Sequence, residues 1–279
     1  MILLEVDRIS YAIPGSFRLQ PISFIQEQGL KIAIAGETGS GKTTVLKIIA
    51  GLLQPESGSV RLNGNPVASP AQKLVPGHHE IAYLSQFFEL PKSLTVRQVL
   101  AYARRMSEPA ADRIHRICEI DHLMDRRTDQ LSGGERQRIA LAKLLVTAPE
   151  MLLLDEPFSN LDPMHRLQMK DVVDRVGDQL GITTIMVSHD ASDNLPWADL
   201  LMVMKEGRLV QQGPPALIYR KPVSEYVGGL FGRYNRFQVD PAMPDKMAFL
   251  RPDDLEFTTG PYYDFEGRVV RLSFLGPYY

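Results

Sequence analysis

The chain has 279 residues, 44% of them hydrophobic, and its 31 Lys and Arg against 33 Asp and Glu give a net charge of −2. This length suits one large α/β domain with a smaller appendage, and without a basic excess nucleic acid is a disfavoured partner. The single cysteine, Cys118, excludes an internal disulfide and suits a reducing compartment.

The first 30 residues are expected to form antiparallel strands, because short apolar runs alternate there with turn residues. The opening MILLEVDRIS has neither the basic leader nor the long apolar core of a signal peptide, so we interpret it as the first strand. No window approaches the roughly 18 unbroken apolar residues that a membrane-spanning helix needs. Any association with a membrane is therefore expected to come through a partner.

A strand, a loop and a helix are predicted next. The run KIAIAG, residues 31–36, is compact and β-branched, whereas TTVLKIIAGL after the loop has its apolar residues close to helical spacing. The change of period across a glycine-rich segment is the arrangement that a phosphate-binding loop requires.

The segment GETGSGKT, residues 36–43, predicts a triphosphate site. Gly36, Gly39 and Gly41 allow successive backbone N–H groups to point into one concavity, and the following helix adds its positive end. Lys42 would reach the β and γ phosphates, and the Thr43 hydroxyl would bind the magnesium that bridges them.

Helices, buried strands and a hairpin are predicted beyond this loop. Helical spacing indicates an insertion from about 90 to 148, with Pro109 separating two helices. MLLLDE and GITTIMVSHD have the pattern of buried strands flanking a helix from about 163 to 180, as in a crossover unit of a parallel sheet. The hairpin turns at Glu206 and Gly207.

Two acidic residues follow the apolar run MLLL. Asp155 is placed at a strand end to anchor magnesium, and Glu156 beside it is the natural general base that orients a water toward the γ phosphate. A structural carboxylate that caps the next helix is the alternative.

The octet LSGGERQR, residues 131–138, predicts a second anion site, because a serine and two glycines open a helix there. Together with GETGSGKT, LLLDEP, SNLD (159–162) and VSHD (187–190), it resembles the ATP-binding cassette (ABC) ATPases that power membrane transporters. The resemblance covers residues 1 to about 230. It implies an α/β P-loop NTPase core with an antiparallel β subdomain and a helical subdomain.

In that family two cassettes enclose two ATP molecules, each between the phosphate loop of one cassette and the LSGGE segment of the other. The resemblance thus implies a second cassette as partner, in a homodimer. It also implies that Asp162 transmits structural changes between the two ATP sites. The implied contacts across the dimer are Ser132, Gly133, Gly134, Glu135 and Asp162.

The resemblance also implies contacts to ATP within one cassette. Tyr11 matches the aromatic residue that stacks on adenine, with an ordinary strand tyrosine as the alternative. The other implied ATP-binding residues are Gly36, Glu37, Thr38, Gly39, Ser40, Gly41, Lys42, Thr43 and Thr44.

Catalytic roles are implied for Glu156 and for two further positions. Gln86 matches the glutamine that touches magnesium and the attacking water at the hinge to the helical insertion. His189 matches the histidine that contacts the γ phosphate and holds Glu156 in place. Thr43, Gln86 and Asp155 form the implied Mg²⁺ set, so ATP and Mg²⁺ are the expected cofactors.

The chain is expected to divide into a cassette, residues 1–235, and a small β appendage, residues 236–279. FLRPDDLEF and GRVVRLSFLG resemble the first strands of the oligonucleotide-fold-like (TOBE-like) regulatory domain found after cassettes for sugars, polyamines, molybdate, sulfate and ferric iron. That domain runs several strands further than Tyr279. The tail is therefore expected to be a reduced version, completed by a dimer partner, or a truncated one.

The expected function is ATP hydrolysis that energises a membrane ABC transporter. A free-standing cassette with a β tail resembles the importer type, which implies integral-membrane permease subunits, an extracytoplasmic substrate-binding protein and a peripheral place on the cytoplasmic face of the cell membrane. The alternative is a soluble ABC ATPase acting on ribosomes or DNA. Such relatives carry two cassettes or a long coiled-coil insertion, whereas here only about 45 residues separate Gln86 from the LSGGE segment.

Overall fold

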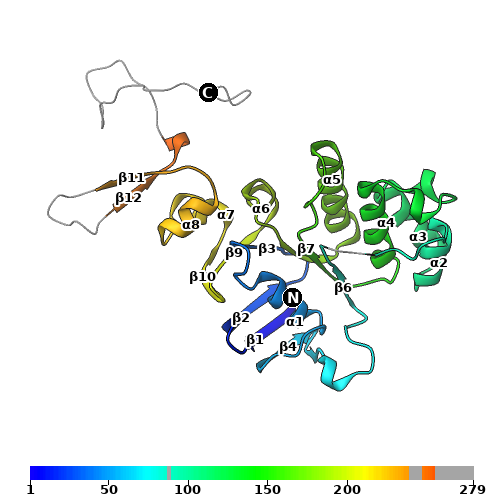
Figure 1. Cartoon of the computed structure of the whole chain (residues 1–279), viewed down its shortest axis with the longest axis horizontal. Helices are drawn as coiled ribbons and strands as arrows, with labels where there is room; N and C mark the ends of the chain where they lie inside the picture. The colour runs from blue at the N-terminus through cyan, green and yellow to red at the C-terminus, as the bar shows by residue number, and fades with distance from the viewer. Residues whose placement is uncertain (87–88, 239–246, 255–279) are drawn as a thin grey trace, which may run out of the picture. The chain divides into compact units, whose positions relative to one another are not determined.

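The computed structural model describes residues 1–86, 89–238 and 247–254 (Figure 1). Contacts between residues divide the chain into two compact units, Met1–Gly232 and Arg233–Tyr279. The phosphate loop, the two acidic residues and the LSGGE segment all lie in the first unit.

An antiparallel sheet forms at the start of the chain, with strand order β2-β1-β4-β5. Along β2 buried residues alternate with exposed ones, as a half-buried sheet requires. Near the turn between the first two strands, Ile13 pairs with Phe17 and Tyr11 pairs with Leu19. The strands are β1 (Ile2–Ile13), β2 (Phe17–Glu27), β4 (Ser57–Leu62) and β5 (Asn65–Pro66).

A central six-stranded sheet has the order β10-β9-β3-β8-β7-β6. All neighbouring pairs are parallel except β9 and β10, which form the predicted hairpin. The parallel order brings the carboxyl ends of the predicted strands to one edge, where ligands bind in open α/β sheets. The strands are β3 (Lys31–Ala35), β6 (Ile81–Leu84), β7 (Met151–Asp155), β8 (Thr183–Val187), β9 (Leu200–Lys205) and β10 (Arg208–Gly213).

The helices lie on both faces of this sheet (Figure 1). Along β7, Leu152 and Leu154 join a hydrophobic cluster with α4 and α5, whereas Met151 and Leu153 join one with α1 and the antiparallel sheet. The helices are α1 (Lys42–Ile49), α2 (Val96–Ala103), α3 (Glu108–Ile117), α4 (Gly133–Leu145), α5 (Pro163–Leu180), α6 (Ala191–Trp197), α7 (Pro215–Arg220) and α8 (Glu225–Leu230), with 3₁₀ turns at Pro70–Gln72, Asp121–Leu123 and Thr128–Gln130.

The helical insertion consists of α2, α3 and α4, which share one buried cluster. Pro109 lies in the first turn of α3, where no helical hydrogen bond needs its missing N–H. Residues 104–107, between α2 and α3, are not helical. Within the described part of the chain, no helix has the length and hydropathy that crossing a bilayer requires.

The second unit contains an antiparallel pair, β11 (Asn235–Gln238) and β12 (Met247–Leu250), followed by a 3₁₀ turn at Pro252–Asp254. The segment GRVVRLSFLG and most of the predicted β tail lie outside the described residues. Its likeness to a TOBE-like domain stays a prediction.

Candidate active site

The phosphate loop, residues 36–43, joins β3 to α1. Gly36 has a φ of 151°, and a Cβ there would lie 2.3 Å from the carbonyl oxygen of Met204 on β9. Gly41 caps α1 at a φ of 101° with no side-chain cap, so no side chain occupies the first N–H groups of this helix. Glycine is therefore required at both positions for the loop to form beside the sheet.

The side chain of Lys42 folds back over this loop. Its Nζ donates hydrogen bonds to the carbonyl oxygens of Gly36 at 2.7 Å and Glu37 at 2.8 Å, and the residue is 7% exposed. Burial lowers the pKa of the ammonium, against the opposing effect of the nearby Glu156 and Asp155 carboxylates. The loop thus presents a cation and backbone N–H groups to the same space, which suits a polyphosphate.

Asp155 ends β7 beside the start of α1. Its Oδ1 accepts a hydrogen bond from the Thr43 hydroxyl at 2.9 Å, and its Oδ2 accepts one from the Tyr83 hydroxyl at 2.8 Å. Burial, followed by the charge of this carboxylate, raises the pKa of Tyr83. The Thr43 and Asp155 oxygens therefore lie together, and a hydroxyl with a carboxylate is a donor set that Mg²⁺ accepts.

Gln86 lies at the same edge of the sheet. Leu84, the last residue of β6, pairs with Leu154 of β7, and Gln86 lies two residues beyond the end of β6. The side chain is exposed. Gln86 therefore follows the carboxyl end of β6, the strand that pairs with β7, and β7 leads into Asp155 and Glu156.

Glu156 and His189 form a hydrogen-bonded pair across the ends of β7 and β8. The His189 Nδ1 lies 2.8 Å from the Glu156 Oε2, and the two side chains are 65% and 15% exposed. Glu156 has a φ of 51°, a left-handed conformation that costs a non-glycine residue about 1 kcal/mol or more. Its backbone N–H donates to Val187, and its carbonyl accepts from the Ser159 hydroxyl at 2.8 Å. These bonds hold the strained residue in place.

The signature segment, residues 131–138, begins α4. Ser132 is its N-cap: the hydroxyl accepts from the Glu135 N–H at 3.2 Å, and the Glu135 carboxylate accepts from the Ser132 N–H at 2.7 Å. Gly133 faces open space. This helix start is therefore a capping box with an exposed glycine beside it.

Asp162 caps α5 and lies next to the signature segment through His165. Its carboxylate accepts from the His165 backbone N–H at 3.2 Å and lies 2.5 Å from the ring Nδ1. The hydrogen bond from the ring keeps the pKa of Asp162 below its usual value. On the other side, a Cβ on Gly134 would lie 2.6 Å from His165 Cδ2. The imidazole thus fills the space that this glycine leaves.

Tyr11 and Phe17 lie on the same face of the β1 and β2 pair, since paired residues of antiparallel strands share a face. Phe17 borders the phosphate loop, because a Cβ on Gly41 would be 2.7 Å from its Cζ. Both aromatic rings are partly buried against the cluster that contains α1. The expected adenine contact at Tyr11 thus has a second aromatic candidate.

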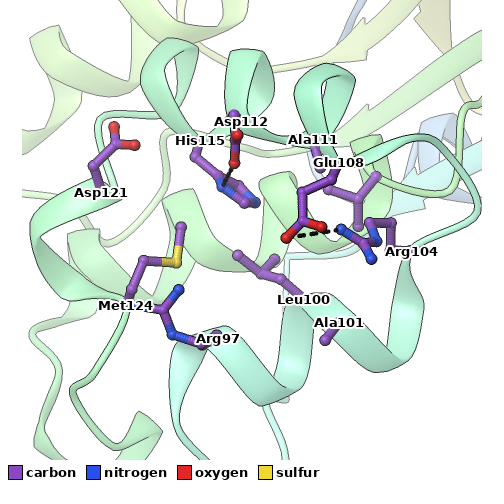
Figure 2. A pocket seen from close by; sticks show the side chains of 11 residues that line it. Arg97, Leu100, Ala101, Arg104, Glu108, Ala111, Asp112, His115, Asp121 and Met124 are labelled. Atoms are coloured by element: carbon purple, nitrogen blue, oxygen red, sulfur yellow. Dashed lines mark ion pairs between the residues drawn. The ribbon is translucent and has the colours of Figure 1, made fainter.

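A separate hollow of about 450 Å³ lies between α2 and α3 (Figure 2). It is lined by residues of both charges, and Figure 2 shows the ion pairs Arg104–Glu108 at 3.5 Å and His115–Asp112 at 3.6 Å. No predicted site residue lines the hollow. The candidate site is therefore the edge of the central sheet.

A family model of ABC transporters matches residues 19–159. The chain belongs to the ABC transporter family. The sulfate/thiosulfate import ATP-binding protein CysA of Synechococcus elongatus is 34% identical, covering 98% of this chain and 83% of its own length. The Fe(3+) ions import ATP-binding protein FbpC 2 of Rhodococcus jostii is 36% identical, with coverages of 98% and 85%.

The fold of this ABC protein also matches solved structures. The structure of cbiO1 from Clostridium perfringens, described as part of the ABC transporter complex cbiONQ, has a TM-score of 0.68 at 29% identity and covers 79% of this chain and 91% of that one. These likenesses confirm the predicted family, the α/β P-loop fold and the ATPase activity. This ABC ATPase binds and hydrolyses ATP.

Three residues of the ABC site were missed from the sequence. Tyr83 supports Asp155 from the neighbouring strand, Phe17 borders the phosphate loop, and His165 joins Asp162 to Gly134. The Tyr83–Asp155, Phe17–Gly41 and His165–Gly134 contacts each join different elements of the chain. Only the strand order and the helix packing bring the partners together.

Proposed function

We propose that this ABC ATPase energises the import of an inorganic ion through membrane permease subunits. The support is the pair of relatives named above, whose names specify import of sulfate or thiosulfate and of Fe(3+) ions. The two relatives differ in the charge of their cargo while sharing the cassette, so selectivity is assigned to the permease and a substrate-binding protein. The ribosome- or DNA-acting alternative gains no support from these relatives.

The observation that carries hydrolysis at this site is the Glu156–His189 hydrogen bond beside the phosphate loop. In the proposed reaction, the Glu156 carboxylate accepts a proton from the water whose oxygen attacks the γ phosphorus in line, while the bond to the ADP oxygen breaks. His189 holds Glu156 and contacts the γ phosphate with its exposed ring edge. Gln86, which follows β6 at the same edge of the sheet, would orient the same water.

The phosphate chain is proposed to lie over the start of α1. Lys42 would exchange its hydrogen bonds to two loop carbonyls for contacts with the β and γ phosphate oxygens. This exchange favours ATP binding, because a buried ammonium pairs better with an anion than with a carbonyl. The residues fit a magnesium ion at Thr43, Gln86 and Asp155. When bound there, it would neutralise charge on the β and γ phosphates. Adenine would stack on Tyr11 or Phe17.

The signature segment is proposed to complete the site of a second copy of this chain. Ser132 and Gly133 are exposed at the start of α4, and Glu135 orders that start through the capping box. Asp162 lies beside them through His165. Two copies would each contribute this surface to the other's ATP, at the cytoplasmic face of the membrane beneath the permease.

The replacement Glu156→Gln tests the base assignment. We expect ATP hydrolysis to fall at least about a hundredfold, because an amide cannot accept the proton, while ATP still binds and a dimer accumulates in size-exclusion chromatography. The matched control is Glu150→Gln, an exposed carboxylate just before the amino end of the same strand, which should hydrolyse ATP normally. Turnover by Glu156→Gln at the rate of the unchanged protein would refute the assignment.

Transport is tested by isolating the native complex from membranes. Co-purification of an integral-membrane partner whose presence raises the ATPase rate is expected, followed by ATP-dependent uptake of sulfate, thiosulfate or Fe³⁺ in reconstituted vesicles. Recovery of the active ATPase without any membrane partner would contradict the proposed import.

A further inference from the structure

The imidazole of His189 is an exposed ring that must point accurately at Glu156. It is 65% exposed, so packing around the ring itself does little to fix its direction. The residues that flank it, Ser188 and Asp190, therefore determine where the ring lies. Both of these neighbours are hydrogen-bonded within a polar cluster at the start of α6.

Ser188 and Asp190 are tied to the first turn of α6. The Ser188 hydroxyl donates to the Asp193 Oδ2 at 2.7 Å, and the Ser188 carbonyl accepts from the Asn194 side chain at 2.9 Å. Asp190 caps α6 by accepting from the Ser192 N–H at 2.8 Å. His189 thus sits in a short loop whose two ends are hydrogen-bonded.

Arg166 of α5 reaches across to this loop. Its Nη2 lies 2.5 Å from the Asp190 Oδ2, and 2.8 and 2.9 Å from the two oxygens of Asp193. Asp193 is 3% exposed, and the Lys170 Nζ is a second cation 2.7 Å from its Oδ1. Charge-assisted bonds to a buried carboxylate are strong and directional, so this contact fixes the loop relative to α5.

Arg166 also belongs to the first turn of the helix that Asp162 caps. Its backbone N–H donates to the Asp162 carbonyl at 2.9 Å. One residue therefore contacts the start of α5 through its backbone and the His189 loop through its side chain. A displacement of Asp162 would therefore move Arg166, and through Arg166 the loop that positions His189 against Glu156.

We propose that Arg166 and Asp193 are positioning residues that align His189 with Glu156 and link that pair to Asp162. This inference rests on the proposed function of Glu156 and His189. It predicts that the contact between Arg166 and Asp193 affects the hydrolytic step more than the binding of ATP.

The test is Arg166→Gln in the full chain, with steady-state ATPase kinetics and ATP affinity measured together. We expect kcat to fall about tenfold, because a small misplacement of a reacting group is enough for such a loss, while the KM and Kd for ATP stay within about twofold. Lys170 still pairs with Asp193 in this variant, so the protein should fold.

The matched control is Arg175→Gln. Arg175 lies on the same helix and pairs with Glu119 at 2.5 Å, away from the loop. Its kcat should be unchanged. The replacement Asp193→Asn provides a second variant: it keeps the shape of the side chain, weakens both cation contacts, and should lower kcat in the same way as Arg166→Gln. Equal kcat values for Arg166→Gln and Arg175→Gln would overturn the inference.

A double-mutant cycle separates positioning from a structural effect. If Arg166 acts through His189, adding Arg166→Gln to His189→Ala should lower kcat by less than about twofold further. A full multiplicative loss would overturn the positioning role. If His189→Ala itself keeps the normal kcat, the proposed function of His189 fails and the inference falls with it; a loss in His189→Ala but none in Arg166→Gln removes only the inference.

Discussion

Two glycine-rich helix starts in this chain differ in how their N–H groups are used. At α1, Gly41 caps the helix without a side-chain hydrogen bond, and the buried Lys42 lies over the loop. At α4, Ser132 and Glu135 form a complete capping box. The N–H groups at the start of α1 are therefore left for a ligand, whereas some of those at the start of α4 are already hydrogen-bonded within the capping box. We therefore propose that the primary phosphate site is at α1 and that α4 adds a few contacts to an anion held elsewhere.

The largest effect is expected at α1. Lys42→Ala should lower ATP hydrolysis by about a hundredfold or more and abolish measurable ATP affinity, because it removes the cation from a buried polyphosphate site. Lys47→Ala is the control, since Lys47 is an exposed lysine in the last turn of the same helix. ATP binding by calorimetry and steady-state hydrolysis measure both. Retained affinity in Lys42→Ala would place the phosphates away from α1.

A smaller effect is expected at α4. Ser132→Ala should leave the ATP affinity of the monomer unchanged. It should lower the rate of ATP hydrolysis about tenfold, because about one hydrogen bond is lost in the dimer. The control is Thr95→Ala in the capping box of α2, which shares the cap geometry. Each replacement should reduce the free energy of unfolding by about 1 kcal/mol. If both variants hydrolyse ATP equally well, Ser132 is only a helix cap.

The smallest effect is expected where α4 meets α5. Gly134→Ala forces a Cβ to 2.6 Å from the His165 ring, although alanine itself favours the helix by about 1 kcal/mol. We expect a fall in hydrolysis of about threefold, since the ring must shift against Asp162. Gly134→Ala should also lower the melting temperature, and adding His165→Ala should restore it because the smaller side chain makes room for the new Cβ. A further drop in the double variant would show that the two residues do not compete for space.

The elements and the linear motifs were predictable because their chemistry lies in adjacent residues. A strand that ends just before Gly36 and a helix that begins at Lys42 follow from the change in apolar period, and the positive φ angles of Gly36, Gly39 and Gly41 explain why glycine stands there. Partners from different elements were not predictable from residue types. Tyr83 is separated from Asp155 by 72 positions, and the parallel register of β6 with β7 decides their contact.

The adenine side illustrates the same limit. The position of Tyr11 in ISYAIPGS predicts an adenine contact at this residue. The strand pairing puts Phe17 on the same face of the sheet, with its ring against Gly41. A bulge in the β1 and β2 register sets which residues pair near the turn. A pattern of aromatic residues in two strands does not contain that information.

The motif residues alone determined that this chain holds ATP and belongs with the ABC ATPases, because a phosphate loop and a helix cap are built from consecutive backbone groups. The resemblance already implied Thr43 with Asp155 and Glu156 with His189, whereas only the tertiary structure brought Tyr83 to Asp155 and Arg166 to Asp193. These pairs depend on the order of strands in the central sheet and on how α5 packs against it. Such contacts follow from burial of the whole core and from no short stretch of sequence.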